Sequence, residues 1–185
     1  MKSPARRFAA VAIMSATIMG CGKGAWREPR GFDELMERAR AEYHWNNYAV
    51  VYAESAAKVP GATPAELMKA YRLGADIRAY IGDQAGAQRK LEQALALDPS
   101  DPDTLTQLAE NNREKPRQAL AYAERAVRAA GGATAPRKAA ITRLWGEILI
   151  DTGDDEGARR ELRAALALAP EDLETLRLLA RLERG

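Results

Sequence analysis

Few side chains in this chain of 185 residues have the chemistry to react covalently or to bind a metal. Cys21 is the only cysteine and His44 is the only histidine. A zinc site needs three or four cysteine, histidine or carboxylate ligands held close together, and His44 has no cysteine or second histidine near it. It stands between two predicted helices, where a turn or capping role fits it better. We therefore predict no metal site.

Enzyme motifs are also missing. The chain has no glycine-rich phosphate loop after a strand, no Gly-x-Ser-x-Gly turn and no histidine placed near a candidate nucleophile. Its many carboxylates have Arg or Lys three or four residues away, which is the spacing of solvated ion pairs on a helix surface. We expect no catalytic residues, no cofactor, no small-molecule substrate and hence no enzyme.

Cys21 directly follows a segment that is typical of protein export. Lys2, Arg6 and Arg7 precede an apolar run over residues 8–20. That run is too short to cross a bilayer, because a spanning helix needs about twenty apolar residues. Residues 1–20 therefore have the charge and hydropathy pattern of a signal peptide.

The tetrapeptide Ile18-Met19-Gly20-Cys21 resembles the lipobox of bacterial lipoproteins. The resemblance implies cleavage before Cys21, a covalent lipid on its thiol and an acyl chain on its amino group. Several acyl chains anchor a protein firmly, whereas one does so only marginally. Gly22, rather than Asp, after the cysteine is compatible with an outer-membrane lipoprotein that faces the periplasm. The alternative is a general signal peptide with an incidental cysteine.

Removal of the signal changes the charge of the chain. The signal holds three of the 28 basic residues and none of the 26 acidic ones, so the mature chain has 25 basic and 26 acidic side chains. A chain so balanced has no broad positive field to attract phosphate backbones. We expect no nucleic-acid partner. Residues 21–31, rich in Gly, Pro and charge, are predicted to be a lipidated cysteine and a short tether.

The remaining residues, 32–183, carry a repeated helical pattern. Residues 82–110 recur at 153–181 with sixteen of twenty-nine aligned positions identical, 71 residues apart. Each copy has a Gly-Asp turn, an Ala-Leu stripe at helical spacing and a proline that ends the helix. Thr63 before Pro64 and Asp101 before Pro102 supply helix starts. The spacing equals two units of about 34 residues plus three.

This pattern resembles the tetratricopeptide repeat (TPR) family. The resemblance implies an all-α fold, a right-handed α-solenoid of antiparallel helix pairs with about four units and a C-terminal capping helix. Units are expected over residues 32–58, 63–97, 101–130 and 134–168, with the cap at 171–183. Gly146 matches the glycine of the family's close helix contact. In the second unit the distance from Leu73-Gly74 to Gly82 is one residue longer than in the family, which leaves the register of that unit open. Arg177, Arg181 and Glu183 of the capping helix are expected to face water.

Partners of the family usually lie in a groove lined by the first helix of each unit. Carried over by position, the resemblance implies that ten residues line this groove: Lys69, Arg72, Asp76, Tyr80, Thr106, Glu110, Arg143, Glu147, Arg177 and Arg181. The first unit lacks the Lys and Asn arrangement that some members use to hold acidic peptide ends. We expect a lipid-anchored scaffold for protein partners in the cell envelope, assisting assembly of a pilus, secretin or export complex. The alternative is an adaptor that recruits peptidoglycan enzymes.

Overall fold

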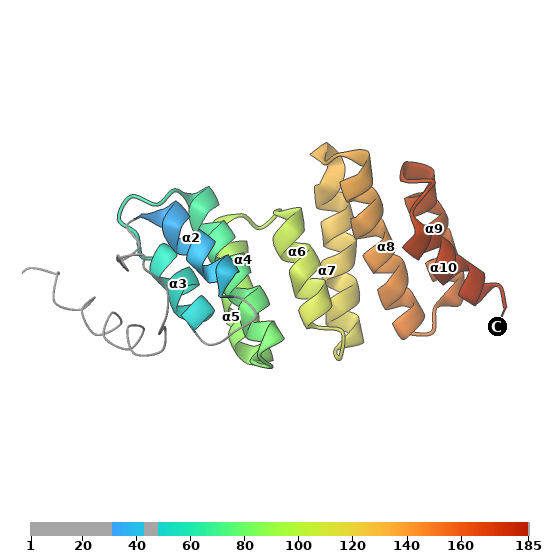
Figure 1. Ribbon diagram of the computed structural model, residues 1–185. Helices are drawn as coiled ribbons and strands as arrows, with labels where there is room; N and C mark the ends of the chain where they lie inside the picture. The colour runs from blue at the N-terminus through green and yellow to red at the C-terminus, as the bar shows by residue number, and fades with distance from the viewer. Residues whose placement is uncertain (1–30, 43–47, 185) are drawn as a thin grey trace, which may run out of the picture.

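The computed structural model describes residues 31–42 and 48–184. Within them the chain forms nine α-helices, one 3-10 turn and no strand, so the predicted all-α solenoid is confirmed. Figure 1 shows the helices stacked side by side along one direction, with the first pair at one end and the last pair at the other. Cys21, His44, the predicted signal and the tether lie outside the described residues. The helices are α2 (Phe32–Ala41), α3 (Tyr48–Ala56), α4 (Pro64–Tyr80), α5 (Gln84–Leu97), α6 (Pro102–Asn111), α7 (Pro116–Ala129), α8 (Ala135–Asp151), α9 (Asp155–Leu168) and α10 (Leu173–Leu182).

Helices α4 and α6 begin at the caps that the sequence predicts. The Thr63 hydroxyl accepts a hydrogen bond from the Glu66 backbone N–H, and the Glu66 carboxylate accepts one from the Thr63 backbone N–H at 2.7 Å. This reciprocal arrangement satisfies two donors that the first turn of a helix leaves free. Asp101 caps α6 in a related way, with its carboxylate 2.8 Å from the Thr104 nitrogen.

The duplicated Gly-Asp turns have one geometry. Gly82 and Gly153 adopt φ angles of 85° and 79°, a left-handed conformation that favours glycine. The aspartate that follows each of them caps the next helix by accepting the N–H of a second glycine, Gly86 or Gly157. A Cβ at Gly86 would lie 2.0 Å from the carboxylate that caps the helix. The tight turn therefore favours glycine at position 86 as well as at position 82.

The close helix contact in the fourth unit is where the sequence predicts it. A Cβ built on Gly146 of α8 would lie 2.8 Å from the Cγ and Cδ2 atoms of Leu162 on α9, which is closer than real side chains approach. Leu162 is fully buried. Gly146 therefore allows α8 and α9 to approach at this point.

The structure settles the register of the second unit, where the equivalent position is one residue after Gly74. A Cβ on Gly74 would meet only Ala53 of α3, at an ordinary 3.7 Å. Ala75 instead packs on Ala87 and Leu91 of α5, and it stands seven residues before Gly82, as Gly146 does before Gly153. The glycine of α4 lies one residue earlier and faces α3 rather than α5.

Candidate functional site

A charged hollow crosses the face formed by the first helices of the units. It has a volume of about 450 Å³ and receives side chains from α2, α4, α6 and α8. Five of the ten predicted groove residues lie together here. The lining is Met36, Arg40, Lys69, Arg72, Leu73, Asp76, Asp103, Thr106, Gln107, Glu110 and Arg137.

The other predicted groove residues lie elsewhere. Arg143 lines a second hollow, and its guanidinium is 2.6 Å from the Glu147 carboxylate. Tyr80, at the C-terminal end of α4, is 59% exposed and lines neither hollow. Arg177 and Arg181 are exposed on α10 and also lie outside both hollows. The structure thus does not bring all ten residues into one site.

An arginine of the second unit and one of the fourth unit pair with the aspartate that precedes the next unit's first helix. In the charged hollow, Arg72 is 2.7 Å from the Asp101 carboxylate, which also accepts hydrogen bonds from the backbone N–H and hydroxyl of Thr104. The same arrangement recurs 71 residues later, where Arg143 pairs with Asp172 at 3.3 Å and Thr175 donates to Asp172. These arginines therefore connect neighbouring units as well as facing the groove.

Asp101→Ala is expected to lower the free energy of unfolding by about 1 to 2 kcal/mol, because it removes a helix cap and the strongest partner of Arg72. Urea unfolding followed by circular dichroism measures the change. Asp155→Ala is the matched control, since Asp155 is exposed in the first turn of α9 and caps nothing. If the two variants unfold at the same urea concentration, Asp101 does not connect the units.

Two carboxylates in the charged hollow, those of Asp76 and Glu110, are buried, and nearby positive charges and hydrogen bonds offset the cost of burying their charge only in part. Burial, reinforced by the nearby Glu110 carboxylate, raises the pKa of Asp76 to about 6. Arg72 and a 2.6 Å hydrogen bond from the Gln107 amide oppose this shift only in part. Desolvation between the helices also raises the pKa of Glu110, with a contribution from Glu147. The hollow therefore favours a ligand that brings positive charge to these carboxylates.

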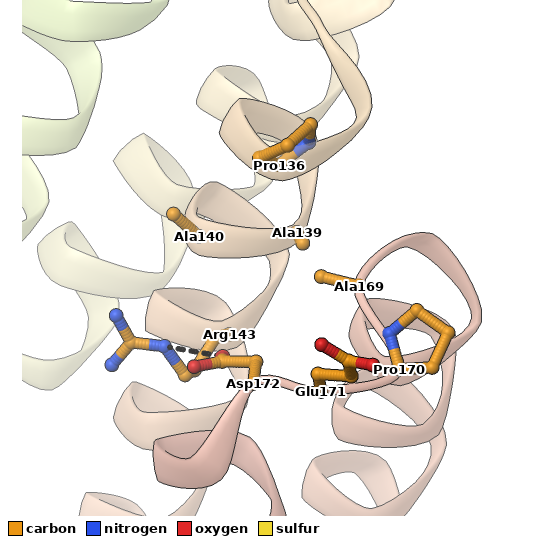
Figure 2. Close-up of a pocket in the computed structure, with 8 residues that line it drawn as sticks. All are labelled: Pro136, Ala139, Ala140, Arg143, Ala169, Pro170, Glu171 and Asp172. Carbon is orange, nitrogen blue, oxygen red and sulfur yellow. Dashed lines mark ion pairs between the residues drawn. The ribbon is translucent and has the colours of Figure 1, made fainter.

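A second, apolar hollow lies between the first half of α8 and the turn that joins α9 to α10 (Figure 2). Its volume is about 520 Å³. Arg143 stands 71 residues after Arg72 in the duplicated pattern, so the two hollows open on the same face of the array. Figure 2 shows the lining residues: Pro136, Ala139, Ala140, Arg143, Ala169, Pro170, Glu171 and Asp172.

The apolar hollow was not predicted from the sequence. Ala139 and Ala140 stand where the second unit has Met68 and Lys69, so two small side chains replace two long ones. This difference between the aligned copies is the sequence feature from which the apolar hollow could have been predicted. It opens a space suited to one apolar side chain of a partner, with the Arg143–Asp172 ion pair at its edge.

Neither a metal site nor a membrane span occurs in residues 31–42 and 48–184. No three histidine, cysteine or carboxylate side chains in this part of the chain cluster closely enough to hold a metal ion. None of its helices is both long and apolar enough to cross a bilayer.

Known proteins share the fold of this chain. MamA from Desulfovibrio magneticus RS-1 superposes with a TM-score of 0.63 at 18% identity, covering 81% of this chain and 82% of its own. YrrB, described as a TPR protein with an unusual peptide-binding site, gives 0.58 at 17% identity, with 82% and 75% covered. The N-terminal domain of stress-induced protein-1 from C. elegans gives 0.58 at 18% identity, with 66% and 99% covered. No curated protein sequence matches the chain.

The sequence itself matches one family model. Residues 139–182, which comprise most of α8 and all of α9 and α10, match the tetratricopeptide repeat. The solved structures extend the likeness in fold over most of the chain. The chain thus matches the tetratricopeptide repeat over residues 139–182, and over most of its length it shares the fold of YrrB, which is described as a TPR protein.

Proposed function

We propose that this protein is a lipid-anchored scaffold that binds a partner protein along the groove face. A TPR fold suggests a protein–protein interaction scaffold in general terms. The observation that carries the proposal is the charged hollow, to which four successive first helices contribute polar side chains. A site of this kind suits an extended segment of a protein better than a small molecule, because it is long and open to solvent.

The charges and the second hollow define the partner segment. Asp76 and Glu110 call for a lysine or arginine, since a positive charge would stabilise carboxylates that burial now disfavours. The apolar hollow beside Ala139 and Ala140 has room for a large apolar side chain. The segment therefore carries a basic residue toward α4 and α6 and an apolar residue toward α8.

The lipid at Cys21 and the envelope location are part of the same proposal. Their support is the lipobox at residues 18–21 after a basic and apolar signal. The protein would then hold its groove in the periplasm, at the outer membrane, and would assist assembly of a pilus, secretin or export complex. Recruitment of peptidoglycan enzymes is the second candidate, and the same groove would serve it.

Metabolic labelling with an alkyne fatty acid tests the anchor. We expect the wild-type protein to be labelled and to remain with the membrane, because its thiol and new amino terminus are acylated. Cys21→Ala is expected to abolish the label and to leave the unprocessed precursor. An unlabelled wild-type protein released in soluble form would contradict anchoring at Cys21.

Crosslinking in intact envelopes distinguishes the two candidate roles. Recovery of pilus, secretin or export subunits in crosslinked adducts is expected under the leading proposal, and recovery of peptidoglycan hydrolases is expected under the second. Adducts should decrease in the variant Asp76→Lys, which places a positive charge where a basic residue of the partner would lie. Adducts unaffected by this change would place the partner outside the charged hollow.

A further inference from the structure

The helix α10 leaves an apolar face uncovered. Leu173 is 66% exposed and Leu176 is 43% exposed, and Ala180, one turn further along, is exposed as well. Arg177, Arg181 and Glu183 face water as the sequence predicts. Leucines nevertheless share that surface with these polar side chains.

The internal repeat shows what such a face does elsewhere in the molecule. Leu176 and Ala180 stand 71 residues after Leu105 and Ala109 of α6. Leu105 is 1% exposed and Ala109 is 0% exposed, because α7 and α8 pack on them. The face of α10 therefore has the composition of a helix-packing surface, and no element within the described residues covers it.

Acidic side chains outnumber basic ones at the start of α10, and basic ones outnumber acidic ones at its end. Glu171 and Glu174 lie at or just before its first turn, whereas Arg181 and Arg184, with the single acidic residue Glu183, lie at or just after its last turn. Arg177, in the middle of the helix, is 3.3 Å from Glu174. Two α10 helices packed antiparallel would place the acidic half of each beside the basic half of the other. Antiparallel packing also aligns the helix dipoles favourably.

We propose that a second copy of this chain covers the face, through antiparallel packing of two α10 helices about a two-fold axis. Such an interface is isologous, so each contact occurs twice. Leu176 of one copy lies over Ala180 of its partner, and Glu174 lies beside Arg181 of the partner. One helix pair buries less area than a stable dimer usually does, so the dimer is weak in solution. Proteins anchored in one membrane would meet at a raised effective concentration.

Charge reversal tests this pairing with the full chain, carrying Cys21→Ser and kept in a density-matched detergent. Sedimentation of this chain with no further substitution, at about 100 µM, is expected to show dimers in exchange with the 20.2 kDa monomer. Glu174→Arg puts two pairs of arginines across the interface, and Arg181→Glu puts two pairs of glutamates there. Each variant alone is expected to remain monomeric, and an equimolar mixture of the two is expected to form heterodimers.

Two further variants complete the design. Leu176→Glu is expected to weaken association at least about tenfold, while Leu168→Glu, at a similarly exposed leucine of α9, leaves it unchanged. Matching circular dichroism spectra establish that all variants are folded. The proposal is overturned if the wild type stays monomeric up to about 1 mM, if Leu176→Glu associates as the wild type does, or if the mixture associates no better than its components.

Discussion

Replacing Gly146 with leucine is expected to lower the free energy of unfolding by about 3 kcal/mol, the largest change predicted for a single substitution in this protein. Even a Cβ at this position would lie 2.8 Å from two side-chain carbons of Leu162, which is fully buried and cannot move away freely. Gly146→Ala is expected to cost less, because better helix propensity returns about 1 kcal/mol. Urea unfolding followed by circular dichroism measures both changes.

Gly74→Ala is the matched control for the Gly146 variants. Both glycines are buried near the middle of a long helix, but a Cβ at Gly74 would be 3.7 Å from the nearest atom, the Cβ of Ala53. Gly74→Ala is therefore expected to be neutral or to stabilise by about 0.5 to 1 kcal/mol. Ala165→Leu, at a fully buried alanine of α9, is expected to destabilise like Gly146→Leu. Equal stability of the Gly74 and Gly146 variants would refute the assigned α8–α9 contact.

Asp76→Asn is expected to stabilise the protein by about 1 to 3 kcal/mol at pH 8. Burial near Glu110 raises the pKa of Asp76 from 3.8 to about 6, so the folded state pays to keep this carboxylate charged at pH 8. Asparagine removes the charge and keeps the oxygen that accepts the Gln107 hydrogen bond. Thermal and urea unfolding at several pH values measure the gain.

The pH dependence gives the sign of this effect. Between about pH 4 and pH 6 the folded state binds more protons at Asp76 than the unfolded state does, so stability falls as pH rises through this window. The free energy of unfolding of Asp76→Asn is expected not to show this part of the decrease. The difference in stability between Asp76→Asn and the wild type should therefore shrink below pH 5. Asp155→Asn, at an exposed position, serves as the control. An advantage for Asp76→Asn that is the same at pH 4 and pH 8 would contradict the proposed cause.

Local features of the fold could be predicted because they depend on residues that are close together in the sequence. The Thr63 to Glu66 capping box and the Gly153-Asp154 turn depend on residues a few positions apart, and both are present as expected. The duplicated stretch also established the alignment that identifies Gly146. The ends of the units followed to within about two residues, as in the first unit, which was predicted to end at residue 58 and whose second helix ends at Ala56.

Features that depend on contacts between units could not be predicted in the same way. The shift from Gly74 to Ala75 follows from which face of α4 meets α5, and that orientation is a property of the packed array. The apolar hollow depends on Ala139 and Ala140 being short where α10 begins. Tyr80 was predicted to line the groove together with Asp76, because carrying the family's groove positions over to this chain assumes that every first helix faces the partner along its whole length.

Site-specific photo-crosslinking in living cells tests the central claim, that the groove face binds a protein partner. A benzophenone amino acid at Lys69, an exposed lining residue of the charged hollow, is compared with the same amino acid at Gln93, an exposed residue of α5 that lines neither hollow. The account predicts a discrete adduct from position 69 that Glu110→Lys greatly reduces, and no such adduct from position 93. The same adduct from both positions, or an adduct from position 93 alone, would contradict it.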